Sequence, residues 1–322
     1  MRCPAAKSCE GQLRKKTRMP ESSNQINLNI SDADYPALFQ AADSTSRAAE
    51  RRHLWFTGVI LGALVACAAL GALAAIFPGS GQKLALASTA GAAVSFVVAS
   101  IRKALKPEKA WYGGRAVAES SKTMSWRYMT GAEPYPVSLP AAEADSKFVS
   151  DLKAMVKDQG QAALALGGEF SDRPQISPRM REVRSSSLAG RRQVYLSARI
   201  EDQRHWYGRK ARGSERAANW YFVLIQVSQA LALAGSVLLL TPLGSRWNLA
   251  GVFSSLATAL VAWLQVRQHE ELAQSYAVAA LELGFVEEQA AGVHDEKELA
   301  AFVAEAENAI SSEHSLWITR HK

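Results

Sequence analysis

The sequence is poor in the residues that secreted proteins and many enzymes rely on. Cysteine occurs only at positions 3, 9 and 67 of 322 residues, too few and too badly placed for a disulfide framework. The six histidines show no metal-ligand spacing: "HEELA" at His269 begins like a zinc-protease motif, but Ala273 stands where the second histidine belongs. No phosphate-binding glycine loop or nucleophile elbow is present. We therefore expect no metal, no cofactor and no catalytic residue, and predict that the protein is not an enzyme.

Charge is missing from four long stretches. Residues 54–77, 84–101, 219–241 and 247–266 contain no charged side chain. A helix needs about 20 apolar residues to cross a hydrocarbon core about 30 Å thick, and a charge at its centre costs roughly 2.5–3.5 kcal/mol. Four such runs predict four transmembrane helices. The alternative is a soluble bundle with very apolar core helices, but a surface helix needs a polar face, which these runs lack over several turns.

The four runs come in pairs joined by short loops. "PGSGQK" connects the first pair and "PLGSR" the second, so each pair is predicted to form an antiparallel hairpin. The predicted fold class is an all-α membrane protein with four transmembrane helices in two hairpins and long cytosolic helices extending from the membrane. Arg51 with Trp55, and Arg216 with Trp220, place the same Arg-x-x-x-Trp pair at both entrances. This pair marks either a weak internal repeat or an interfacial anchor.

The distribution of lysine and arginine predicts the orientation. Residues 1–53 carry nine of them, 102–218 carry twenty-two and 267–322 carry four, whereas the two short loops contain only Lys83 and Arg246. This bias places both termini and the central segment in the cytoplasm, as a multi-pass protein of a bacterial inner membrane. No cleavable signal peptide is predicted, because the basic N-terminus has no apolar core behind it.

The chain divides into four predicted parts. Residues 1–33 form a basic, disordered tail that could contact anionic lipid or stay solvated, and we do not expect nucleic-acid binding. Residues 34–137 form a first two-span module, residues 138–186 a cytosolic helix and linker, and residues 187–322 a second two-span module that ends in cytosolic helices.

Several helices are predicted outside the membrane. One runs over residues 35–52 with little apolar face, one ends near Gly131, and one covers residues 141–159. From about Ser187 the chain can remain helical into the third span. The stretch "YLSARIEDQRHWYGRKA" lies on this last helix, which is therefore able to pack on a partner and to carry movement into the membrane.

The cytosolic stretches resemble a known family. "MREVRSSSLAGRRQVYLSARIEDQRHWYGRKA" before the second hairpin and "ENAISSEHSLW" near the C-terminus are similar to SLATT proteins. "WYGGRAVAESSKTMSWRYMTGAEPYP" after the first hairpin looks like a second, divergent SLATT class, so the resemblance covers about residues 34–322 as two tandem modules. The residues that carry it, and that are our candidates for coupling or interaction, are Tyr195, Arg199, Trp206, Tyr207, Lys210, Trp111, Arg115, Glu119, Trp126, Arg127, Glu313, His314 and Trp317.

SLATT proteins are two-transmembrane effector domains named for their association with SMODS nucleotidyltransferases and SLOG sensor domains. The resemblance implies an effector of a bacterial conflict or anti-phage system, in which a nucleotide signal or a separate sensor protein triggers perforation of the inner membrane. The alternative is a non-conducting membrane scaffold that recruits cytosolic partners through its basic segment 102–218. The residues from the first module could equally form a solvated charge ladder, and we expect His314 and Trp317 to dock on the stretch 195–211.

The spans contain polar residues but no ionisable ones and no interrupted half-helices, which argues against pumps and ion-coupled transporters. Their polar residues could hydrogen-bond between helices of one chain or line a wet path between several copies. Four short helices of one chain enclose too little space for a conduit, so the pore hypothesis implies a homo-oligomer in the lipid bilayer. The candidate pore or interhelical polar residues are Gln226, Gln229, Ser236, Ser254 and Thr258.

Overall fold

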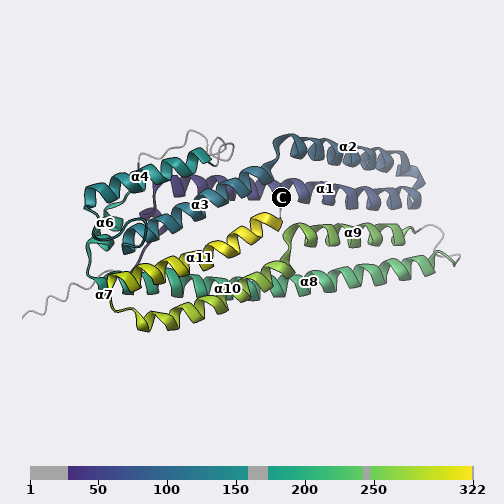
Figure 1. Cartoon of the computed structure of the whole chain (residues 1–322). Coiled ribbons are helices and arrows are strands. Elements are labelled where there is room, and N and C mark those ends of the chain that lie inside the picture. The colour runs from purple at the N-terminus through teal and green to yellow at the C-terminus, as the bar shows by residue number, and fades with distance from the viewer. Residues whose placement is uncertain (1–27, 159–172, 242–246, 321–322) are drawn as a thin grey trace, which may run out of the picture.

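The protein consists of two long helical hairpins and a helical bundle at one end of them. The computed structural model describes residues 28–158, 173–241 and 247–320, and beyond Ser311 it describes the backbone of the last helix only (Figure 1). The hairpins are α1 (Ala37–Ile76) with α2 (Gly81–Leu105), and α8 (Asp202–Leu238) with α9 (Leu249–Arg267). They lie side by side, because α1 contacts α9.

The bundle, which we call the extramembrane bundle, contains the remaining helices together with the first turns of α1 and α8 (Figure 1). Its helices are α3 (Pro107–Thr130), α4 (Ala141–Asp158), α6 (Pro178–Ser185), α7 (Leu188–Tyr195), α10 (His269–Gln289) and α11 (Glu296–Arg320). Every regular element among the described residues is helical.

Four segments of the described chain are long and apolar enough to cross a membrane. They are Ala37–Ile76, Pro78–Thr130, Leu188–Leu238 and Leu249–Gly292. At most 22% of the residues in the most apolar window of each segment are buried inside the protein. Apolar surface of this extent does not stay exposed to water in soluble proteins. The predicted all-helical, four-span fold is confirmed, and the chain is a multi-pass membrane protein.

The two hairpins follow one plan. In each, a second span ends at a residue in the left-handed backbone region, Lys106 with φ 44° and Gln268 with φ 46°. The next helix then returns along the first one, α3 along α1 and α10 along α8. A left-handed conformation costs a residue with a side chain roughly 1–2 kcal/mol. In both modules the backbone is therefore strained at the junction between the second span and the bundle.

The helix predicted from about Ser187 is present but is not uniform. Ser187 caps α7 by accepting a hydrogen bond from the Gly190 amide at 3.2 Å. Between α7 and α8 the segment Leu196–Glu201 is π-helical. Such wide turns within α-helices occur frequently at functional sites. The predicted end of α3 is also confirmed, since Gly131 follows Thr130 with φ 78°.

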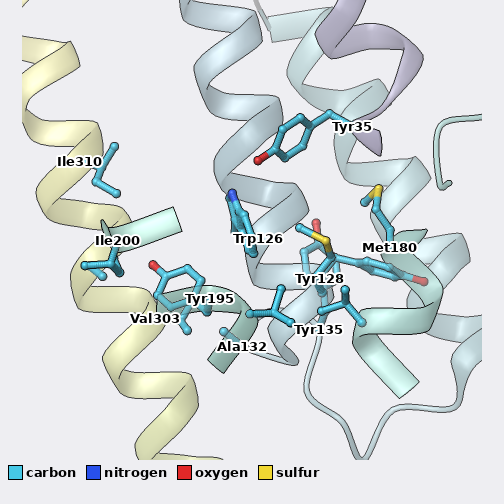
Figure 2. Packing of buried hydrophobic residues seen from close by; sticks show 14 of the residues in the cluster. Tyr35, Trp126, Tyr128, Ala132, Tyr135, Met180, Tyr195, Ile200, Val303 and Ile310 are labelled. Carbon is cyan, nitrogen blue, oxygen red and sulfur yellow. The ribbon is translucent and has the colours of Figure 1, made fainter. Parts of the chain in front are cut away.

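The hydrophobic core lies in the extramembrane bundle, where aromatic side chains from α3 meet α6 and α7 (Figure 2). The segment after α3 belongs to this core, because Phe148 of α4 and Met180 of α6 are fully buried. The Arg184 guanidinium donates to the carbonyl oxygens of Tyr128, Tyr135 and Pro136 at 2.8–2.9 Å. These bonds fix the turn after α3 against α6.

Candidate coupling site

A buried ion pair lies at the middle of the extramembrane bundle. Arg199 Nε and Nη2 donate to the two carboxylate oxygens of Glu307, at 2.9 and 2.8 Å. The two side chains are 1% and 0% exposed. Arg199 belongs to the π-helical segment and Glu307 to α11. The pair therefore joins the head of α8 to the last helix of the chain.

Two further hydroxyl groups complete the hydrogen bonding of the carboxylate. The Tyr195 hydroxyl donates to Glu307 Oε1 at 3.1 Å, and the Thr123 hydroxyl donates to Oε2 at 2.7 Å. We call Arg199, Glu307, Tyr195 and Thr123 the ion-pair centre. A buried ion pair is tolerated only when good geometry and additional hydrogen bonds offset the loss of hydration. Here each carboxylate oxygen accepts two hydrogen bonds, so the charge of Glu307 is fully satisfied.

The electrostatics of the ion-pair centre keep Arg199 charged. Burial lowers the pKa of Arg199, but the charge and hydrogen bonds of Glu307 outweigh burial and hold that pKa above its ordinary value. Burial, reinforced by Glu307, raises the pKa of the Tyr195 hydroxyl well above its ordinary value. Tyr195 therefore remains a neutral hydrogen-bond donor at every physiological pH.

Aromatic rings surround the ion-pair centre on the side of α3. The ring of Trp126 meets the ring of Tyr195 edge to face, with centroids 5.5 Å apart (Figure 2). Tyr195 meets Phe302 of α11 in the same way, with centroids 5.9 Å apart. The ring centroid of Tyr35, just before α1, lies 6.4 Å from the ring centroid of Trp126. Edge-to-face pairs add roughly 0.5–1.5 kcal/mol beyond the area that they bury. The rings pack α3, α7, α11 and the start of α1 around the ion-pair centre.

Other contacts fix both ends of this arrangement. Arg192 of α7 donates to the Val293 carbonyl, just before α11, at 2.6 Å, and Arg191 forms a short ion pair with Glu296. On the other side, Arg127 Nη2 of α3 donates to Asn308 Oδ1 of α11 at 3.0 Å. Helix α11 is thus bound to α7 at its start and to α3 along its length.

The boundary between two family matches runs through this site. Residues 36–192 match the SMODS and SLOG-associating 2TM effector domain 3, SLATT_3, and residues 195–317 match the SMODS and SLOG-associating 2TM effector domain 1, SLATT_1. The chain belongs to the SLATT family. No curated protein and no solved structure matches it.

The ion-pair centre is built from both SLATT modules. Thr123 and the neighbouring Trp126 come from the first module, whereas Tyr195, Arg199 and Glu307 come from the second. Glu307 Oε2 accepts hydrogen bonds from both modules, one from Thr123 and one from Arg199. Any movement of α11 must therefore change contacts in both SLATT modules at once.

The remaining candidates of the second SLATT module lie further along α8. Trp206 and Tyr207 both pack on Tyr276 of α10, with ring centroids 5.4 and 5.7 Å apart. The Lys210 ammonium lies 5.5 Å from the Trp206 ring centroid. These aromatics connect α8 to α10 in the turns between the ion-pair centre and the membrane.

The candidates of the first SLATT module fall into two groups. Trp126 and Arg127 contact α7 and α11 as described above. Trp111, Arg115 and Glu119 lie nearer the membrane end of α3: the Trp111 carbonyl accepts from the Ser46 hydroxyl of α1 at 3.0 Å, and Arg115 pairs with Glu119 at 3.1 Å as the spacing predicts. The site therefore includes two of these five residues.

The three C-terminal candidates, Glu313, His314 and Trp317, lie outside the described side chains. Glu307, which is not among the predicted site residues, is instead the first residue of the stretch "ENAISSEHSLW". A signal for it exists in the sequence, since Glu307 falls at helical spacing between the apolar residues Val303 and Ile310, both buried. An acidic residue inside an apolar stripe indicates a buried partner. Nothing in the sequence points to Thr123.

The polar candidates of the spans differ in their surroundings. The hydroxyl groups of Ser236 and Thr258 donate to the carbonyl oxygens of Ala232 and Ser254, four residues earlier in their own helices, at 2.9 Å. Gln226 and Gln229 are exposed on the surface of α8. The two glutamines thus present amide groups that the membrane or a neighbouring chain meets.

No cluster of three or more histidine, cysteine, aspartate or glutamate side chains that could hold a metal ion occurs within the described part of the chain.

Proposed function

We propose that this protein is the membrane effector of a bacterial conflict system, which oligomerises and permeabilises the inner membrane when its cytosolic bundle receives a signal. Both modules match domains that are described as effectors. The excess of Lys and Arg outside the two short loops supports a cytosolic extramembrane bundle with both termini on the same side. The signal would come from a nucleotide or a separate sensor protein.

The observation that carries this proposal is the unbroken helix α8. It has 37 residues, so it spans about 55 Å from the ion-pair centre to the far end of the third span. The π-helical segment that holds Arg199 continues directly into it. A signal that moves α11 changes the position of Arg199 and, through a rigid helix, the position of the span. The packing of Trp206 and Tyr207 on Tyr276 transmits the same movement to α10.

The membrane end of α8 carries a polar feature suited to assembly. Gln226 and Gln229 lie roughly 10–15 Å along the span from its start at residue 219, close to the middle of a bilayer core about 30 Å thick. Exposed amides at this depth face lipid in a single chain, which is unfavourable. In an oligomer they can pair with one another or line a wet path. Assembly of several copies through these amides is what a pore requires.

The test is the membrane potential of bacteria after induced expression, followed with a voltage-sensitive dye at matched levels of inserted protein. We expect the wild type to depolarise the cells and the double variant Trp206→Ala, Tyr207→Ala to insert without depolarising them. We expect Gln226→Leu with Gln229→Leu to change conductance in planar bilayers, whereas the matched control Val223→Leu with Val227→Leu leaves it unchanged. If the glutamine variant conducts like the wild type and the valine control, the two glutamines do not line the pore.

A further inference from the structure

Helix α10 has two apolar stripes, and only one of them is covered. The inner stripe, including Leu283 and Val286, is buried in the bundle at 2% and 7% exposure. The outer stripe consists of Val278, Leu281 and Phe285, which are 54%, 65% and 68% exposed. All three residues belong to α10, which lies at the edge of the bundle (Figure 1). Large apolar residues gathered on one face in this way mark an interaction surface.

Lipid does not cover the outer stripe. Val278 and Phe285 follow His269, the first residue of α10 after the last span, by nine and sixteen residues. Because a helix rises 1.5 Å per residue, they lie roughly 14 and 24 Å beyond that point. The polar layer of a bilayer extends only about 5–8 Å on each side of the hydrocarbon core. The occupant of the stripe is therefore a protein.

A groove between α8 and α10 runs beside the outer stripe. Small residues line it, among them Gly208 and Ala211 from α8 and Ala277 and Ala280 from α10, and Leu281 lies at its rim. The groove continues past Gly284 to Phe285. A lining of small residues lets another helix approach to the 8–10 Å between axes that helix packing requires.

The spacing of the outer stripe suits a parallel helix pair. Gln274, Val278, Leu281, Phe285 and Glu288 follow one another at intervals of four, three, four and three residues, the pattern of a coiled-coil seam. Two copies of a membrane protein inserted in the same direction are related by an axis along the membrane normal. Their α10 helices are then parallel and at the same height, so that residue 281 of one copy meets residue 281 of the other.

The charges of the groove complement a second α10. Residues 202–219 of α8 contain five basic and two acidic side chains, whereas residues 269–289 contain five glutamates and no lysine or arginine. A second α10 in the groove brings its glutamates close to Arg212, which lines the α8 side of the groove together with one acidic residue, Glu215. Opposite charges on two surfaces favour and orient their association.

The same face of α8 continues into the membrane. From Glu215 and Asn219 at the groove, intervals of three and four residues lead to Phe222, Gln226 and Gln229. All three of these span residues are exposed. The hydrocarbon core holds no water, so an amide exposed on the surface of a span can gain a hydrogen-bond partner from a second transmembrane chain. One continuous face thus needs a partner that has both a cytosolic helix and a span.

We propose that this face, made by the α8/α10 groove, the outer stripe of α10 and the two glutamines of α8, is the docking surface for a second copy of this chain. The inference rests on the oligomerisation in the proposed function and gives it a defined interface. The seam between the two α10 helices sets the register, and Gln226 and Gln229 meet their counterparts in the bilayer.

The first test is disulfide crosslinking of the full chain in native membranes, in a background with Cys3, Cys9 and Cys67 replaced by Ser. We expect Leu281→Cys to form a covalent dimer on mild oxidation, because equivalent positions in a parallel seam come within disulfide distance. The control is Val149→Cys on α4, another exposed apolar position of the bundle at 43% exposure, which should remain monomeric. Absence of the Leu281→Cys dimer, or its crosslinking to a different protein instead, overturns the proposal.

The second test asks whether residue 281 meets itself, using two differently tagged copies. We expect Leu281→Glu in both copies to reduce their co-purification at least tenfold, and Leu281→Glu in one copy with Leu281→Lys in the other to restore it. Failure of this rescue overturns the parallel seam. The membrane-potential assay separates the docking surface from the proposed permeabilisation. Crosslinked dimers without depolarisation support the docking surface and refute permeabilisation. Depolarisation without crosslinking refutes only the docking surface.

Discussion

The extramembrane bundle and the membrane hairpins are held together by different interactions. The bundle contains a buried ion pair, Arg199 with Glu307, within a shell of aromatic rings. The first hairpin is joined by a reciprocal pair of weak neutral bonds, in which the Cys67 thiol donates to the Ser88 carbonyl at 3.1 Å and the Ser88 hydroxyl donates to the Cys67 carbonyl at 3.0 Å.

The two kinds of interaction give the bundle a defined geometry and leave the spans freer to move. An ion pair buried in the bundle has one good geometry, and a displaced charge is costly. Helices that meet through small residues in lipid lack such a penalty, because lipid and neighbouring apolar side chains solvate them about equally well. Under the proposed function, a signal would shift the bundle between defined arrangements, and the spans would follow with little resistance.

The largest effect should come from removing one partner of the buried ion pair. Glu307→Ala leaves Arg199 buried without its counter-ion, which typically costs about 3–5 kcal/mol. The free energy of unfolding, measured with denaturant in detergent and followed by circular dichroism, checks this value. The double variant Arg199→Met, Glu307→Leu should recover most of the loss, since it leaves no unpaired charge.

An exposed ion pair of the same bundle is the control for that experiment. Arg204 pairs with Glu287 at 2.7 Å, but the side chains are 38% and 30% exposed. Because water screens such pairs, Arg204→Ala should change the free energy of unfolding by less than about 1 kcal/mol. Equal losses for Arg204→Ala and Glu307→Ala would refute the special role of the ion-pair centre.

A smaller loss is expected from crowding the second hairpin. A Cβ atom added to Gly235 of α8 would lie 2.8 Å from the Ala250 backbone nitrogen of α9, too close for any real contact. Gly235→Ala should therefore separate the two helices and cost about 1–3 kcal/mol of stability. Gly71→Ala in the first hairpin is the control, since a Cβ there meets nothing within 4 Å. Thermal unfolding in detergent should show a lower midpoint for Gly235→Ala only.

The bundle should also be sensitive to alkali. Burial, with an added contribution from nearby carboxylates, raises the pKa of Tyr128, Tyr135 and Tyr195. In the unfolded chain these groups lose their protons near pH 10, whereas in the folded chain they keep them. Stability is therefore fully present below about pH 10 and falls as the pH rises above it.

The measurement is a titration that follows the tyrosinate absorbance and the helix content together. We expect the buried tyrosines to ionise only as the bundle unfolds, and Tyr195→Phe to reduce the steepness of the fall in stability. Tyrosinate that forms with full helix content at the ordinary pKa would show that these hydroxyls are not buried in solution.

The sequence predicts the spans well because each one depends on composition alone. An uncharged run of about 20 residues has one stable environment, so residues 54–77 and 84–101 identify the first hairpin without any tertiary information. The ends of elements were predictable for the same local reason, as at Gly131. These features require no knowledge of which helices meet.

The bundle is harder to predict because its contacts join distant parts of the chain. The helix over residues 35–52 was expected to have little apolar face, yet Leu38 and Phe39 are buried at 4% and 5% exposure, against the bundle. Arg199 was predicted as a site residue, but the pairing with Glu307, 108 positions later, follows from the packing of α11 and not from local pattern. Periodicity identifies a buried polar position but does not identify its partner.

The smallest predicted effect concerns the two junctions that link the bundle to the hairpins. Lys106 and Gln268 both adopt left-handed backbone angles, which glycine adopts without steric cost. Neither junction has a glycine at this position, so both carry strain of roughly 1–2 kcal/mol. Lys106→Gly and Gln268→Gly should each relieve part of it and raise the free energy of unfolding by up to about 1 kcal/mol, partly offset by the greater freedom of glycine in the unfolded chain.

The matched control for the junctions is Gly213→Ala, at a helical position of α8 where a Cβ meets nothing within 4 Å and alanine is preferred. If strain at the junctions helps the bundle and the spans to shift relative to each other, the two glycine variants should be more stable than the wild type and yet depolarise cells less. Gly213→Ala should gain stability without any loss of depolarisation. A gain in stability with unchanged depolarisation in all three would mean that the strained junctions serve only to reverse the chain. That result would leave the unbroken helix α8 as the route by which the bundle acts on the membrane.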